Sequence, residues 1–154
     1  MRVNFDTISR SISKKELPVI GMGSGRIVYD LGNGYVVKMA RNKKGLAQNK
    51  AEFGIAAGNN SCLIADVLSV SIDYRYLIMR KAQKIESFDP VWKYHKVNSL
   101  KELFRLDFFY DFIRNNGLLL PDLCRKSSWG IIDGRPVLVD YGFTKDVRKY
   151  YRLI

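Results

Sequence analysis

The hydrophobic positions near the start of the chain change from a helical to a strand-like period. Phe5, Ile8 and Ile12 recur at helical spacing, which predicts a short amphipathic helix that ends before Pro18. Three short apolar runs follow, "LPVIGM", "RIVYDL" and "YVVKMA", and glycine-containing turns separate them. Since an Asn33–Gly34 pair favours a tight turn with positive φ, these runs predict three antiparallel strands.

The middle of the chain predicts one helix and a second pair of strands. Segment 42–58 reads as a helix that Gly58 ends, with Leu46, Phe53 and Ile55 on its apolar side. Segment 66–82 predicts two strands about a turn at Asp73. Residues 83–98 show no clean period, and we interpret them as a linker.

The last third predicts one long helix and a hairpin. Ser99 and Glu102 form a capping box at the start of the helix, which runs to "NNG". Its apolar face is broad and consists of Leu100, Leu103, Phe104, Phe108, Phe112 and Ile113. A final hairpin, "WGIID" and "RPVLVD", turns at Asp133–Gly134. These elements predict an α+β fold.

Length and composition favour one domain without a membrane segment. The chain has 154 residues, of which 47% are hydrophobic, enough for one sizeable core. Its apolar runs are too short to span a bilayer, and its start lacks the apolar stretch of a signal peptide, so we expect a cytoplasmic protein. Cys62 and Cys124 lack the spacing of a zinc site or a disulfide framework, and we expect both to be reduced and buried.

The net charge points to an anionic partner. The chain has 26 Lys and Arg against 15 Asp and Glu, a formal charge of +11. Such a balance favours a nucleotide, a nucleic acid or an acidic protein surface. The basic residues are scattered, however, so a solvated basic surface is the alternative. They include Lys14, Lys15, Lys43, Lys44, Arg125, Lys126, Arg148 and Lys149.

Two features could carry chemistry. Gly21, Gly23 and Gly25 form a GxGxG pattern, which either lets the backbone approach phosphates or only turns a hairpin. Lys38 stands in the apolar run "YVVKMA", where alternation places it on the same face as Val36 and Ala40. A buried ammonium requires an anion, but an exposed lysine is the alternative.

The order of these features resembles the protein-kinase-like fold, in particular its small bacterial and phage branches and the aminoglycoside-phosphotransferase type. The resemblance runs from about Val19 to Gly142. It implies an N-lobe over residues 1–82, a linker over 83–98 and a reduced C-lobe over 99–154. The N-lobe would be an antiparallel sheet with one helix, and the C-lobe would be strongly truncated and helical.

The resemblance also implies roles for individual residues in binding ATP and magnesium. The three glycines would cover the nucleotide phosphates, with Arg26 where the family's third glycine falls. Lys38 would hold the α and β phosphates, and Glu52 on the following helix would orient it. Asp122 would accept the proton of the substrate hydroxyl, and Asp140 of "DYG" would bind magnesium.

The chain departs from the family pattern around these aspartates. Leu120 and Pro121 replace the usual His and Arg before Asp122, and no asparagine follows before Asp140. A second metal ligand would then have to come from Ser127 or Ser128. Few residues follow Asp140, so we do not expect peptide substrates to be held as in eukaryotic protein kinases.

Two functional hypotheses follow. The first is a minimal nucleotide-binding protein, either a very small kinase or a pseudokinase with weak or absent catalysis. The second is a non-enzymatic protein, for example a phage-encoded inhibitor, that uses its basic surface to bind an acidic protein or a nucleic acid. The fold alone does not decide between them.

Overall fold

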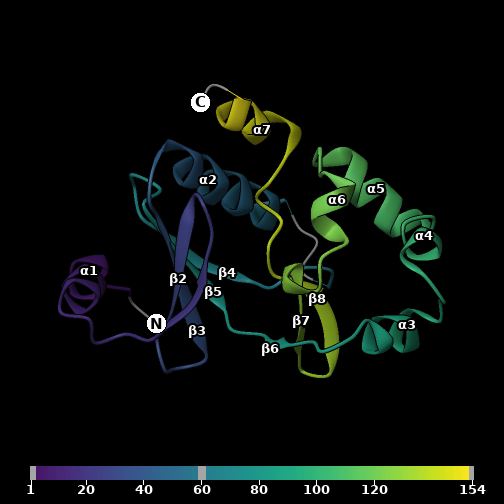
Figure 1. Cartoon of the computed structure of the whole chain (residues 1–154), viewed down its shortest axis with the longest axis horizontal. Helices are drawn as coiled ribbons and strands as arrows, with labels where there is room; N and C mark the ends of the chain where they lie inside the picture. Colours follow the sequence, from purple (N-terminus) through teal and green to yellow (C-terminus); the bar gives the residue numbers. More distant parts are fainter. Residues whose placement is uncertain (1–2, 59–61, 153–154) are drawn as a thin grey trace.

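A five-stranded antiparallel sheet forms the first half of the protein in this computed structural model, which describes residues 3–58 and 62–152 (Figure 1). Its strand order is β1-β2-β3-β5-β4. The strands are β1 (Val19–Met22), β2 (Arg26–Asp30), β3 (Tyr35–Ala40), β4 (Val67–Val70) and β5 (Tyr76–Arg80). Both predicted strand groups are therefore present, and the central strands β3 and β5 join them.

Helices cover both faces of this sheet. Helix α1 (Phe5–Ser13) packs its apolar side chains against Val37 and Ile78 on one face. Helix α2 (Lys43–Ala57) lies on the other face, where Val36 and Ile55 belong to the main core. Since neighbouring strand residues point to opposite faces, the central strands are apolar at nearly every position.

A second, three-stranded sheet stands beside the first. It consists of β6 (Gln83–Lys84), β7 (Trp129–Ile132) and β8 (Arg135–Leu138). The predicted turn between β7 and β8 is confirmed, because Asp133 and Gly134 have φ values of 52° and 74°. Leu138 connects the two sheets, since its amide donates to Leu63 O and its carbonyl accepts from Ala65 N, each at 2.8 Å.

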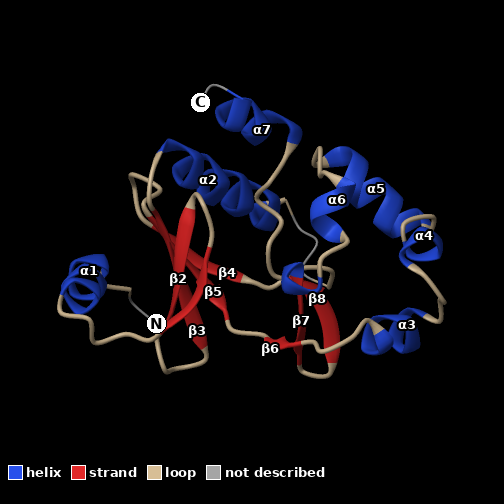
Figure 2. Ribbon diagram, in the orientation of Figure 1, coloured by secondary structure: helices blue, strands red, loops and turns tan. Residues whose placement is uncertain are grey.

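The remaining helices are short, and all but the last lie around the second sheet (Figure 2). They are α3 (Asp89–His95), α4 (Leu100–Leu103), α5 (Asp107–Asn115), α6 (Leu120–Leu123), the 3₁₀ helix η1 (Lys126–Ser128) and α7 (Lys145–Arg152). Trp129, Phe109 and Leu123 are all buried among them. Helix α7 returns to lie along α2 (Figure 1).

The predicted long helix is wrong in one respect, because it is two helices. Half of the predicted capping box is present: Glu102 N donates to Ser99 Oγ at 3.1 Å, while Glu102 Oε2 accepts from Asn98 N and not from Ser99 N. The helix then breaks after Leu103. Leu103 and Phe112 are both buried, yet at about 100° per residue they would face opposite sides of one straight helix. The break lets both reach the same core.

Three smaller expectations also need correction. Segment 83–98 is not irregular, since it contains β6 and α3, whose Val91 is fully buried; its role as a linker between lobes stays a prediction. Phe53 and Phe108 are 39% and 47% exposed, so they lie outside the core. The two cysteines, Cys62 and Cys124, are free thiols as expected, but both are exposed.

The architecture confirms the predicted α+β class, with an antiparallel sheet that carries helix α2 and a small helical part that follows. The boundaries of the N-lobe, linker and C-lobe stay predictions. None of the helices in the described part of the chain has the length and apolar character needed to cross a bilayer.

Candidate functional site

The predicted ion pair between Lys38 and Glu52 is present at the centre of the molecule. Lys38 projects from β3 towards α2, and its Nζ lies 2.9 Å from both Oε1 and Oε2 of Glu52. Lys38 is 5% exposed and Glu52 is fully buried. Lys38 Nζ also donates to the carbonyl of Val139, which immediately precedes Asp140. The pair therefore connects the sheet, α2 and the "DYG" segment.

Arg26 joins this pair and turns it into a four-residue cluster. Its Nη2 lies 2.7 Å from Glu52 Oε1 and 3.0 Å from Asp140 Oδ1. Its Nη1 donates to Asn49 Oδ1 at 3.1 Å. We call Arg26, Lys38, Glu52 and Asp140 the charge cluster; it contains two cations and two carboxylates.

The sequence interpretation treated Arg26 only as a departure from the glycine pattern. In the structure Arg26 is 7% exposed, and its guanidinium donates hydrogen bonds to Glu52 and Asp140. The signal was available in the β2–β3 hairpin, where Arg26 pairs with Ala40 and Val28 pairs with Lys38. Residues two apart share a face, so this register places Arg26 on the face of Lys38.

Asn49 is a second residue that the sequence interpretation missed. It lies one helical turn before Glu52 and is fully buried. Its Nδ2 lies 2.8 Å from Tyr74 O, 3.2 Å from Lys38 O and 3.3 Å from Arg75 O. Asn49 thus attaches α2 to the ends of the central strands. The sequence did indicate this role, because Asn49 stands three positions before Glu52 and the two side chains share one face of the helix.

The segment around Asp140 is fixed by its neighbours. Tyr141 is buried, and its hydroxyl donates to Ala65 O at 2.9 Å. Gly142 lies against α2 so closely that an added Cβ would stand 2.9 Å from Glu52 Cγ. The side chain of Asp140 itself is 43% exposed to solvent. It forms the solvent-facing side of the charge cluster.

The glycine loop is bound to the start of α2. Gly23 N donates to Arg26 O at 2.9 Å and closes a tight turn. Arg41 Nη1 donates to Gly23 O at 2.8 Å, and Asn42 Nδ2 donates to Ser24 O at 2.9 Å. Arg41 N donates to Gly25 O, also at 2.8 Å. The loop carbonyls therefore face α2, and the loop stands next to Arg26.

Two of the loop glycines have room for a side chain. An added Cβ at Gly21 would lie 3.5 Å from Val28, and one at Gly23 would lie 4.0 Å from Arg26 O. These are ordinary contacts, so packing within the chain does not require glycine at either position. Gly45 on α2 differs, because its Cβ would collide with Gly25 O.

Asp122 lies near Asp140, on α6. Its side chain is 14% exposed, and its Oδ1 is 3.8 Å from Nη1 of Arg125. Burial, with the nearby charge of Asp140, raises the pKa of Asp122 to about 6. The predicted catalytic aspartate thus lies near Asp140, and its pKa is raised well above its ordinary value.

The charges within the cluster keep Glu52 ionised. Burial by itself would raise the pKa of Glu52, but Arg26 and Lys38 outweigh it and hold that pKa below its ordinary value. A buried carboxylate between two cations fixes both of them in position, while loss of either partner leaves an uncompensated charge.

The residues around Asp140 offer few protein oxygens for the magnesium site predicted there, and that site stays a prediction. Magnesium prefers octahedral oxygen ligands. Asp140 Oδ1 accepts from Arg26, and the Ser128 hydroxyl donates to Asp122 O at 2.7 Å. Over residues 3–58 and 62–152, no three His, Cys, Asp or Glu side chains gather in a way that could hold a metal ion. A hydroxyl that donates its hydrogen keeps its oxygen lone pairs, so the second ligand predicted from Ser127 or Ser128 stays a prediction.

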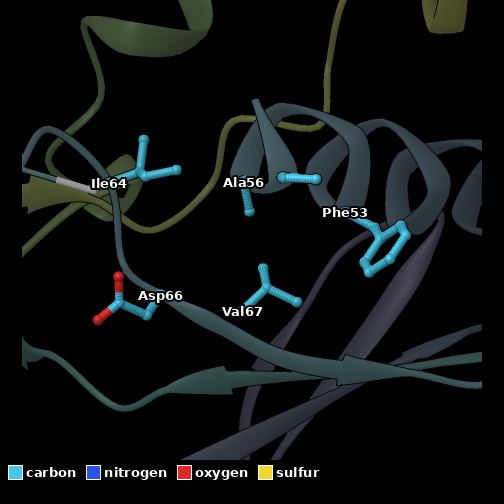
Figure 3. A pocket seen from close by; sticks show the side chains of 6 residues that line it. Phe53, Ala56, Ile64, Asp66 and Val67 are labelled. Atoms are coloured by element: carbon cyan, nitrogen blue, oxygen red, sulfur yellow. The ribbon is translucent and has the colours of Figure 1, made fainter. Parts of the chain in front are cut away.

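A cavity of about 150 Å³ lies outside the charge cluster, between the end of α2 and the start of β4 (Figure 3). Its walls are mostly apolar, and Asp66 is the acidic residue among them. The lining residues are Phe53, Ala56, Ala57, Ile64, Asp66 and Val67. It contains none of the predicted site residues.

No protein-family model matches the chain, and no curated protein matches its sequence. Among solved structures, it is similar to APH(2")-IIa in a ternary complex with streptomycin and ATP, and in a complex with gentamicin. The identities are 20% and 22%, and both TM-scores are 0.42. In each case the alignment covers 76% of this chain and 40% of the other.

A third similar structure is the PknI kinase domain of M. tuberculosis, with 16% identity and a TM-score of 0.45. That alignment covers 84% of this chain and 59% of the other. Similarity at these TM-scores says nothing of activity, ligand or partner. The features that this chain shares with the kinase-like fold predicted from its sequence are the strand order, helix α2 on one face of the sheet and the Lys38–Glu52 pair.

Proposed function

We propose that this protein binds a nucleoside triphosphate such as ATP, as a minimal kinase-like phosphotransferase or pseudokinase. The observation that carries the proposal is the buried Lys38–Glu52 pair on the sheet face next to the glycine loop. A lysine held by a carboxylate in this position has a fixed direction, which is what contact with nucleotide phosphates requires.

The glycine loop supports the same function. Gly21 and Gly23 have space for a side chain, so the fold itself does not explain their identity. Contact between the main chain of the loop and a ligand does explain the two glycines, because a phosphate approaches main-chain amides closely only where no side chain intervenes. The proposed ligand therefore lies over residues 21–25.

Catalysis would be weak or absent. Asp122, with a pKa of about 6, is largely ionised at neutral pH and suits a general base. The metal-binding side of the site is incomplete, however, since Asp140 is bonded to Arg26 and no asparagine follows Asp122 before it. Phosphoryl transfer depends mainly on positioning and charge neutralisation, so this deficit lowers its rate.

Thermal unfolding with and without ATP tests nucleotide binding. A ligand at 100 times its dissociation constant stabilises the folded state by about 2.7 kcal/mol. We expect a rise in Tm for the wild-type protein and none for Lys38→Met. The matched control is Lys93→Met, a substitution of an exposed lysine on α3, which should respond like wild type. An unchanged wild-type Tm at millimolar ATP would contradict the proposal.

A second candidate is a polyanion-binding protein, and one observation favours it. Lys43 and Lys44 begin α2, Arg148 and Lys149 belong to α7, and these two helices lie along each other. Lys14 and Lys15 instead follow α1, on the opposite face of the sheet. The basic residues at the ends of α1 and α2 therefore lie on opposite faces of the sheet.

Oligonucleotide binding over a salt series tests this second candidate. Each neutralised duplex phosphate contributes about −0.9 to the slope of log K against log salt. Binding through α2 and α7 predicts a steep slope that Lys43→Glu with Lys149→Glu reduces, while Lys14→Glu with Lys15→Glu does not. An acidic protein is the better partner if no oligonucleotide binds even at low salt.

A further inference from the structure

We propose that the Arg26 guanidinium takes the place of a metal ion at Asp140, so that this protein binds nucleotide without magnesium. The inference rests on the proposed nucleotide-binding function. It names the form of the ligand, a metal-free nucleoside triphosphate, and the residue that makes the metal unnecessary.

The first argument is the position of the guanidinium. One nitrogen of Arg26, Nη2, lies between Glu52 Oε1 at 2.7 Å and Asp140 Oδ1 at 3.0 Å. Arg26 is buried, and Asn49 Oδ1 fixes its other terminal nitrogen. The cation beside Asp140 is thus part of the chain and is held by three side chains from two other segments.

The second argument is electrostatic. An arginine stays charged at all accessible pH values, so this cation is permanent. A divalent ion at Asp140 would stand next to Arg26 and be repelled by it, although water at the 43% exposed Asp140 screens part of this repulsion. Removal of Arg26 from Asp140 would leave a buried guanidinium with one carboxylate fewer, which is costly.

The third argument is the shortage of metal ligands. Asp140 is the only predicted magnesium ligand with a carboxylate, and one of its oxygens already accepts from Arg26. The hydroxyl of Ser128 is directed to Asp122 O. A hard cation would therefore have few protein oxygens to replace its water ligands.

The fourth argument concerns the ligand. Arg26 directly follows the glycine loop and shares the sheet face of Lys38, so two fixed cations border the place proposed for the phosphates. The terminal nitrogens of Arg26 already donate to Asn49, Glu52 and Asp140, so Arg26 would act on the phosphates through its charge. Asp140, in this arrangement, is a positioning residue that acts through Arg26.

The test compares ATP affinity by calorimetry in EDTA and in magnesium chloride. We expect wild-type dissociation constants that agree within about threefold in the two buffers. Arg26→Gln should weaken binding in EDTA by about tenfold or more and should recover part of it in magnesium, because Asp140 becomes available to the ion. Arg26→Lys should keep binding in EDTA, since it keeps the charge. Lys93→Gln serves as the surface control.

A second measurement uses Mn²⁺ and no nucleotide. Electron paramagnetic resonance should show no Mn²⁺ bound to the wild-type protein at micromolar metal. The outcomes are distinguishable. If ATP binds only in magnesium, this inference is overturned and nucleotide binding is not. The same holds if the wild-type protein binds Mn²⁺ in the absence of nucleotide. No ATP binding in either buffer overturns both. The wild-type comparison remains decisive even if Arg26→Gln fails to fold.

Discussion

Gly142 stands against the backbone of Gln48, so that a Cβ at Gly142 would lie 2.7 Å from Gln48 O. This contact joins the "DYG" segment directly to α2, the helix that carries Glu52 and Asn49. Gly142 has no positive φ that would require glycine. Its identity is explained by close approach alone, and the charge cluster depends on that approach.

Gly142→Ala should therefore separate the "DYG" segment from α2. Because backbone rather than a flexible side chain blocks the Cβ, we expect a destabilisation of about 1–3 kcal/mol and weaker ATP binding. Urea unfolding and calorimetry measure the two effects. Gly54→Ala on the same helix is the control: it meets no atom within 4 Å, so it should stabilise α2 by about 0.5–1 kcal/mol. A stable Gly142→Ala variant would contradict this role for the contact.

Glu52→Gln should destabilise the protein more than Lys38→Met does. Glu52 serves two cations, so its loss leaves Lys38 and Arg26 without their shared carboxylate, at a cost of about 3–5 kcal/mol. After Lys38→Met, by contrast, Glu52 retains Arg26. Chemical denaturation of the two variants gives the comparison. Equal losses would mean that Arg26 does not compensate Glu52.

Asn49→Ala should loosen α2 from the central strands. It removes donors to three carbonyl oxygens and the acceptor for Arg26 Nη1, so buried polar groups are left without these bonds. We expect a loss of about 2–4 kcal/mol in the free energy of unfolding. Hydrogen exchange should show faster exchange in α2. Lys50→Ala, at the exposed neighbouring position, removes only a contact with the Tyr74 ring and should change stability by less than about 1 kcal/mol.

Local patterns were sufficient to predict much of the fold. The glycine turns and β-branched runs predicted the strands, and the apolar surroundings of Lys38 predicted its pairing with Glu52. Both follow from rules that act over short distances: turn chemistry, alternation, and the cost of an unpaired buried charge. The order of the motifs then indicated how the elements assemble.

The rest depended on tertiary contacts. Arg26 lies 114 residues from Asp140 in sequence, and no local rule connects them. The resemblance to kinases even obscured Arg26, because it assigned a glycine to that position. The break between α4 and α5 likewise arises from the need to bury both Leu103 and Phe112 in one core. Helical periodicity alone predicted a helix that continues across this break.

Asp122 should make stability fall as pH rises towards neutrality. Burial, followed by the charge of Asp140, raises its pKa from 3.8 to about 6, so between these values the folded state binds more protons than the unfolded state. The folded state is therefore favoured at the acidic end of this window, and the advantage is lost above about pH 6. Asp122→Asn should remove this loss and stabilise the protein at pH 7 by about 1–3 kcal/mol.

The difference between Asp122→Asn and wild type is the quantity to measure, because the lowered pKa of Glu52 acts in the opposite direction on the wild-type profile. Urea unfolding of both proteins from pH 4 to pH 8 should give a difference that grows towards pH 6 and is then constant. Carbon NMR of the Asp122 carboxyl group should place its titration in the same range. A flat difference, or titration near pH 4, would show that Asp140 and burial do not control Asp122.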